Sequence, residues 1–101
     1  MRYNKLVRNK IPEIIKSSGK SAKIHRAQIK EYKSKLLDKL LEESKEYLKS
    51  KKEEELADIL EVVYALSKMH KLTNTELESL RKRRARERGA FDRRIILEEV
   101  E

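Results

Sequence analysis

The sequence predicts a long helix from about Ala27 to Ser50. Apolar side chains recur in this segment at steps of three, four or seven residues, which is the spacing of a helix with one apolar side. The positions are Ile29, Tyr32, Leu36, Leu40 and Tyr47. A helix with one apolar side needs a neighbour, so we expect this one to pack against another helix.

The charged stretch from Lys49 to Glu54 predicts a turn, and a second helix is expected from Glu55 to His70. Large apolar residues lie around most of the circumference of this second segment, which predicts burial on more than one side. Because the turn between the two segments is short, the two helices are expected to be antiparallel.

Helix signals also occur at both ends of the chain. A short helix from about Lys10 to Ser18 is indicated by Asn9 as N-cap, Pro12 in the first turn and Gly19 as the stop. A third major helix is expected to start near Asn74 and to end before Gly89. Two capping boxes favour this start, Thr73 with Glu76 and Thr75 with Glu78.

The last segment, Phe91 to Glu101, contains the apolar triplet Ile95, Ile96 and Leu97. It could form a short strand or an extended arm that packs on a neighbouring molecule. We therefore expect one all-α domain, residues 1–101. Its fold would be a helical bundle of two long antiparallel helices, a third helix and a short N-terminal helix.

Composition adds limits to this picture. The chain has 101 residues, 44% of them charged and none of them cysteine, which excludes a disulfide scaffold and a thiolate metal site. A helical domain this small and polar can bury only a limited share of its surface. We therefore expect it to be completed as a homodimer or a higher homo-oligomer. It has no run of about 18 apolar residues and no apolar signal segment, so we expect a cytoplasmic protein without a membrane partner.

Acidic residues share the apolar sides of both long helices. On a helical wheel Glu43 falls in the middle of the first apolar stripe and Glu46 on its flank, whereas Glu55 and Asp58 lie among apolar residues of the second helix. Each pair is spaced i, i+3, so both members can point into one cleft. An ion pair between Glu43 and a Lys or Arg of another helix is the plainer interpretation of one acid in this position.

Four carboxylates in one cleft repel one another unless a cation accompanies them. Oxygen ligands without cysteine or paired histidine favour Mg²⁺, with Mn²⁺ possible, over Zn²⁺. A chance run of solvated acids is the alternative in so charged a chain.

These residues resemble the EExxE and ExxD motifs of the all-α nucleoside triphosphate pyrophosphohydrolases, the MazG-like superfamily. The motifs are EESKE at residues 42–46 and ELAD at residues 55–58. The opening KLVRNKIP (5–12), the middle ELADILEVVYA (55–65) and the late RGAFDRRIIL (88–97) are similar to small phosphoribosyl-ATP pyrophosphohydrolase-like proteins.

The resemblance implies an enzyme that binds Mg²⁺ and cleaves a nucleotide between its α and β phosphates, with Glu43, Glu46, Glu55 and Asp58 as metal ligands and catalytic acids. One of these acids could instead position the attacking water. No glycine-rich phosphate loop is present, so cationic side chains would hold the phosphates. The candidates are Arg8, Lys10, Lys39 and Arg88. For Lys39, an i, i+4 ion pair with Glu43 is the alternative role.

A different class of function stays open. The segment Arg81 to Arg94 has eight basic and two acidic residues and accounts for most of the net charge of +8. This cluster could bind the phosphate backbone of RNA or DNA without catalysis. The same arginines could instead pair with acidic residues of another subunit.

Overall fold

The computed structural model describes residues 3–101, and this part of the chain contains four helices and no strand. They are α1 (Ile11–Ser17), α2 (Ile29–Ser50), α3 (Glu53–Met69) and α4 (Asn74–Arg88). The all-α prediction is confirmed. Met1 and Arg2, part of the basic opening stretch of the sequence, lie outside the described residues.

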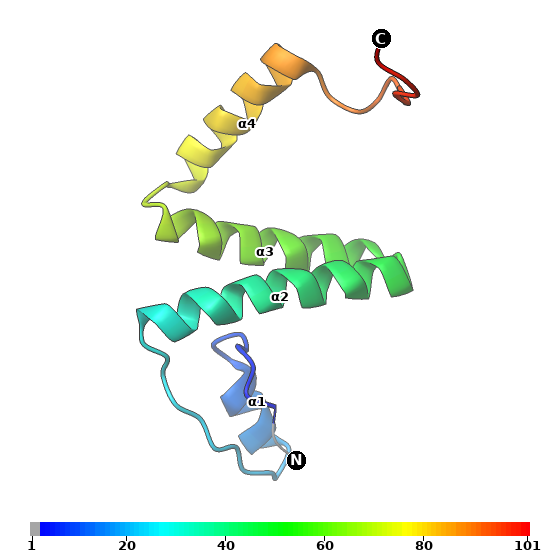
Figure 1. Ribbon diagram of the computed structural model, residues 1–101. Helices are drawn as coiled ribbons and strands as arrows, with labels where there is room; N and C mark the ends of the chain where they lie inside the picture. The colour runs from blue at the N-terminus through cyan, green and yellow to red at the C-terminus, as the bar shows by residue number, and fades with distance from the viewer. Residues whose placement is uncertain (1–2) are drawn as a thin grey trace.

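Helices α2 and α3 form an antiparallel hairpin, and most helix–helix contact in the molecule lies between them (Figure 1). Leu36 of α2 is 2% exposed and Val62 of α3 is 7% exposed, and these are the buried hydrophobic residues within residues 3–101. The core is therefore a thin seam between two helices.

The turn between α2 and α3 lies within the predicted stretch from Lys49 to Glu54 and consists of Lys51 and Lys52. Helix α2 ends at Ser50 as predicted, whereas α3 begins at Glu53, two residues before the predicted start at Glu55. Lys51 has a left-handed backbone with φ of 56°, and its amide donates to the carbonyl of Tyr47 at 2.7 Å. This single left-handed residue closes α2 and reverses the chain.

The first helix begins later than predicted, and Asn9 is not its N-cap. Lys10 occupies the cap position without a side-chain hydrogen bond, and Pro12 lies in the first turn as expected. The amide of Ile11 donates to the carbonyl of Arg8 at 3.0 Å, so Asn9 belongs to a turn before the helix. Gly19, with φ of +86°, follows the end of α1 as predicted.

The start of α4 is confirmed as a capping box of Thr73 and Glu76. The Thr73 hydroxyl accepts from the Glu76 amide, and the Glu76 carboxylate accepts from the Thr73 amide, both at 3.1 Å. The second box is not formed, because α4 already begins at Asn74 with Thr73 as its N-cap, and Glu78 is bound to Arg81.

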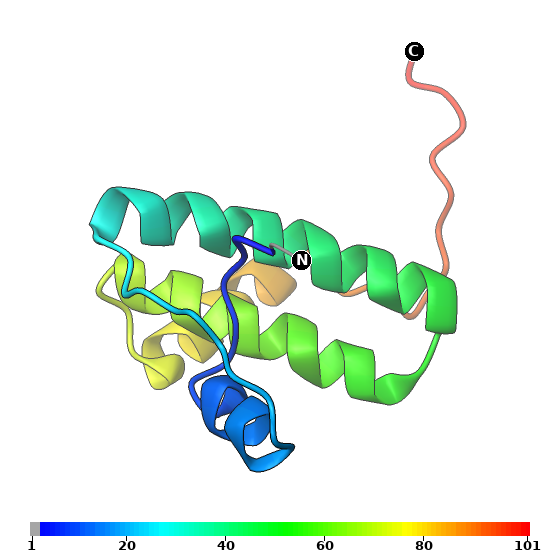
Figure 2. The ribbon, with the colours of Figure 1, turned by 90° about the horizontal axis from the view of Figure 1, so that it is seen from below.

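The N-terminal segment with α1 and the last helix α4 lie on opposite sides of the hairpin (Figures 1 and 2). The segment around residues 3–10 crosses the hairpin, whereas α4 diverges from α3 and touches it only near the connection between them. The tail after α4 contains a turn in which the Arg94 amide donates to the carbonyl of Phe91, and it forms no strand. Phe91 and the triplet at residues 95–97 are 76–98% exposed. No helix in the described residues is long and apolar enough to cross a membrane.

Candidate metal centre

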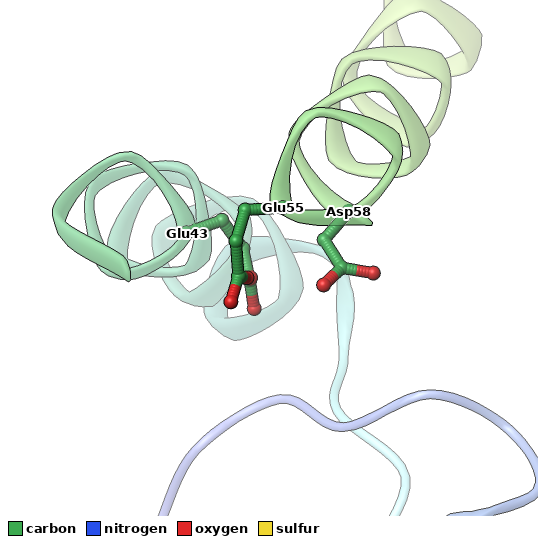
Figure 3. A group of neighbouring side chains, drawn as sticks. All are labelled: Glu43, Glu55 and Asp58. Carbon is green, nitrogen blue, oxygen red and sulfur yellow. The ribbon is translucent and has the colours of Figure 1, made fainter. Parts of the chain in front are cut away.

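Three carboxylates from the two hairpin helices meet at one place. Glu43 of α2 and Glu55 and Asp58 of α3 each offer an oxygen, and these oxygens lie within 4.8 Å of one another. Figure 3 shows that the three side chains point to the same side of the hairpin, where the N-terminal segment passes. All three residues are partly buried.

The helical pattern explains this convergence. Glu43 is close to Leu36 and Leu40 on the wheel of α2, so it points toward α3, and its side chain is 13% exposed. On α3, Glu55 and Asp58 lie on either side of the direction of Val62, which is buried against α2. Packing the two apolar seams together therefore brings the acids together.

The fourth predicted acid does not join the group. Glu46 is exposed and is absent from the cluster of carboxylates in the described residues. A step of three residues turns a side chain by about 60° around the helix axis, which moves Glu46 away from α3. The group of three oxygens leaves out Glu46, and its place in a common cleft with the other acids stays a prediction.

The acids are balanced by cations from two sources. Lys39, one turn before Glu43 on α2, lies 3.5 Å from its carboxylate, as the alternative role for Lys39 anticipated. Arg8 of the N-terminal segment donates from Nη2 to Oδ1 of Asp58 at 2.7 Å. At an effective dielectric of about 20, two carboxylates 4.8 Å apart repel by about 3 kcal/mol, so compensation of this kind is required.

A further ion pair was not anticipated from the sequence. Lys5 donates to Glu42 at 3.1 Å, and Lys39 contacts the other oxygen of Glu42 at 3.4 Å. Partial burial raises the pKa of Glu42, but the hydrogen bond from Lys5 and the charge of Lys39 outweigh it, so this pKa lies below its ordinary value. The sequence signal that could have indicated this ion pair is the position of Lys5, which lies three residues before Arg8 in the same short segment.

Two further phosphate-binding candidates, Lys10 and Arg88, remain to be placed relative to the acids. Lys10 is exposed at the start of α1. Arg88 ends α4, on the opposite side of the hairpin from the N-terminal segment (Figures 1 and 2). The structure therefore brings Arg8 and Lys39 to the acids and leaves Arg88 away from them.

The geometry is compatible with a small hard cation. Ligand distances of 2.0–2.1 Å around Mg²⁺ require coordinating oxygens within about 4.2 Å of one another. The three oxygens lie within 4.8 Å, so small side-chain rotations suffice to reach that spacing. All-oxygen ligation from carboxylates is the chemistry that Mg²⁺ and Mn²⁺ prefer.

The comparisons with known proteins identify no relative. The chain matches no protein-family model, and neither a curated protein nor a solved structure is significantly similar to it. The class defined by the fold and the site is a small all-α protein with a carboxylate cluster between two antiparallel helices.

Proposed function

We propose that the protein is a Mg²⁺-dependent nucleotide pyrophosphohydrolase. Its substrate would be a nucleoside triphosphate or a phosphoribosyl-ATP-like nucleotide, cleaved between the α and β phosphates to a monophosphate and pyrophosphate. The observation that carries the proposal is the convergence of Glu43, Glu55 and Asp58 from two successive helices. The resemblance of the EESKE and ELAD segments to pyrophosphohydrolase motifs adds the reaction class.

In this proposal Glu43, Glu55 and Asp58 hold the metal. A bound Mg²⁺ would neutralise the phosphates and stabilise the charge that develops on the phosphoryl oxygens. Glu46 is one turn along α2 from Glu43 and outside the group. We assign to Glu46 the role of orienting the attacking water and accepting its proton. A carboxylate in this role lies beside the metal ligands and does not itself bind the metal.

Arg8 and Lys39 are the cations closest to the acids and are the proposed phosphate contacts. Arg8 belongs to an irregular segment, and its side chain is 55% exposed, so it can exchange Asp58 for a phosphate oxygen without unfolding a helix. Lys39 is held on α2 between Glu42 and Glu43, and its side chain is 17% exposed. It therefore supplies a positioned charge, while Arg8 supplies a movable one.

Pyrophosphate release from a panel of ribo- and deoxynucleoside triphosphates and phosphoribosyl-ATP, with and without Mg²⁺, tests the proposal. We expect metal-dependent release from at least one substrate. Glu43→Gln and Asp58→Asn are expected to lower the rate by about 10²-fold or more, the scale of losing one group that stabilises a developing oxyanion. Circular dichroism of both variants checks that the helices are retained.

Glu61→Gln is the matched control, because Glu61 is exposed on α3 and lies outside the carboxylate cluster. Its rate should equal that of the wild type. Metal-dependent release that survives both Glu43→Gln and Asp58→Asn would contradict the assigned site.

The second candidate function, nucleic-acid binding without catalysis, is favoured by the exposure of α4. All its basic side chains from Arg81 to Arg88 are exposed. Within the described residues, two of them have acidic partners, Arg81 with Glu78 and Arg83 with Glu87. This candidate predicts that neutralising Arg83, Arg84 and Arg86 lowers both the affinity for RNA or DNA and its salt dependence, whereas Glu43→Gln changes neither.

A further inference from the structure

Residues 3–10 cross the hairpin on the side of the carboxylate cluster and are bound to both of its helices (Figures 2 and 3). We call this segment the strap. Its Lys5 donates to Glu42 of α2 at 3.1 Å, and its Arg8 donates to Asp58 of α3 at 2.7 Å. The two ion pairs therefore span the seam between the helices, and the second of them ends on a member of the carboxylate cluster.

Few other interactions attach the strap to the hairpin. Within the described residues, helix–helix contact joins α2 with α3 and α3 with α4, whereas α1, which follows the strap, makes no such contact. Neither the strap nor α1 contains a buried residue, although Leu6 and Ile11 are half-buried. In the part of the chain that the structure describes, the pairs of Lys5 and Arg8 are the side-chain hydrogen bonds between the strap and the hairpin.

Both ion pairs are weak enough to open. The four side chains are 35–55% exposed, so water screens their attraction. An exposed pair of this kind favours the paired form by about fivefold at most, because two long side chains must also be ordered. The strap is therefore held in place but can be released by a competitor for either carboxylate.

Asp58 is the carboxylate for which such a competitor exists. A guanidinium at 2.7 Å from its Oδ1 occupies one of the directions from which a metal ion could approach. A divalent cation on this carboxylate would repel Arg8 about twice as strongly as a univalent cation at the same distance. Lys39 also neutralises the cluster, but it belongs to α2 and its displacement would move no other segment. Arg8 is thus the cation that connects the site to the strap.

We propose that the strap responds to divalent cations: Arg8 is the counter-charge of the metal-free site, and binding of a divalent cation at the carboxylate cluster releases it. This inference rests on the proposed function for the metal site and adds an order of binding to it. The metal binds first and frees Arg8, which then contacts the phosphates of the nucleotide. Lys5 keeps the strap near the hairpin, because its partner Glu42 lies outside the cluster.

Isothermal titration calorimetry with Mg²⁺ alone measures the competition. Arg8→Gln removes the competing cation and should tighten Mg²⁺ binding by about fivefold, the factor by which the ion pair favours the closed strap. A residue that merely supported the site would weaken binding when replaced. Arg26→Gln is the matched control, because it removes the same side chain from an exposed position before α2. Its affinity should stay within about twofold of the wild type, since salt screens a distant charge.

The position of the strap can be measured directly, because the chain has no cysteine. Spin labels on Asn9→Cys in the strap and Lys45→Cys on α2, both exposed positions, report the distance between them by pulsed electron paramagnetic resonance. Saturating Mg²⁺ should lengthen and broaden this distance in the otherwise wild-type chain. With Arg8→Gln the distribution should already be broad without Mg²⁺. Labels on Lys45→Cys and Glu61→Cys, both within the hairpin, are the control and should not respond.

Each outcome separates the strap from the reaction. Equal Mg²⁺ affinity of the wild type and Arg8→Gln, or a strap distance that Mg²⁺ leaves unchanged, would overturn the strap proposal alone. No Mg²⁺ binding by any variant would overturn it together with the metal centre. Tighter binding by Arg8→Gln and release of the strap, without pyrophosphate release from any nucleotide, would support the strap and defeat only the proposed reaction.

Discussion

Glu42 shows how one residue connects the irregular N-terminal segment to the hairpin. Its carboxylate is bound by Lys5, which is 37 positions away in sequence, and by Lys39 on its own helix. Since its pKa lies below the ordinary value, folding stabilises the ionised form. The contribution to stability is therefore complete above the unfolded pKa, near 4.5, and is lost as the pH falls through the lower folded pKa.

Glu42→Gln is expected to remove this part of the pH dependence. The free energy of unfolding, measured in urea at one protein concentration, should be lower in the variant than in the wild type at pH 7. The difference should shrink as the pH is lowered below about 4.5, because the wild-type carboxyl then becomes protonated. Glu98→Gln, at an exposed position of the tail, is the control and should show no such convergence. A constant difference at all pH values would contradict the ion-pair account.

At the scale of elements, α4 is set apart from the other helices. It has a complete capping box at its start but no buried residue, and it touches α3 only near the connection. Its stability therefore depends on local interactions, including the pair of Glu78 and Arg81, rather than on tertiary packing. Such a helix can unfold while the hairpin stays intact.

Thr73→Ala should destabilise α4 by about 1 kcal/mol, the usual cost of losing a hydroxyl N-cap. Because α4 opens locally, we expect amide hydrogen exchange to quicken about fivefold within α4, with little change in α2 and α3. Thr75→Ala is the matched control, since the sequence offered Thr75 as an alternative cap and the structure does not use it. Equal effects of the two substitutions would argue against the observed capping box.

At the scale of the whole molecule, the hairpin separates two surfaces. One carries the carboxylate cluster on the side of the N-terminal segment, and α4 lies on the other side (Figures 1 and 3). In the proposed function, the affinity for the metal depends on Arg8 and Lys39, which already neutralise the acids, because a divalent ion would displace at least the pair of Arg8 and Asp58.

Binding of Mg²⁺ to the folded state should raise thermal stability. At one hundred times its dissociation constant the gain is about 2.7 kcal/mol, which for a domain of this length corresponds to a rise in Tm of roughly 10 to 20 °C. Differential scanning calorimetry with Mg²⁺ and then with excess chelator measures it. Asp58→Asn should abolish the rise and Glu61→Gln should retain it. A rise that persists in Asp58→Asn would place the ion elsewhere.

The sequence by itself determined the helical segments and several of their ends, among them the Thr73 cap, the Gly19 stop, the end of α2 at Ser50 and the end of α4 before Gly89, because spacing and capping are local properties. It also indicated which acids lie on the apolar side of a helix, since a helical wheel gives the direction of each side chain around the axis of that helix. Only the tertiary structure decided that Glu43 meets Glu55 and Asp58 while Glu46 does not, because this depends on how α2 is rotated against α3. The contacts of Lys5 and Arg8 likewise depend on the path of an irregular segment across the hairpin, which no periodicity encodes.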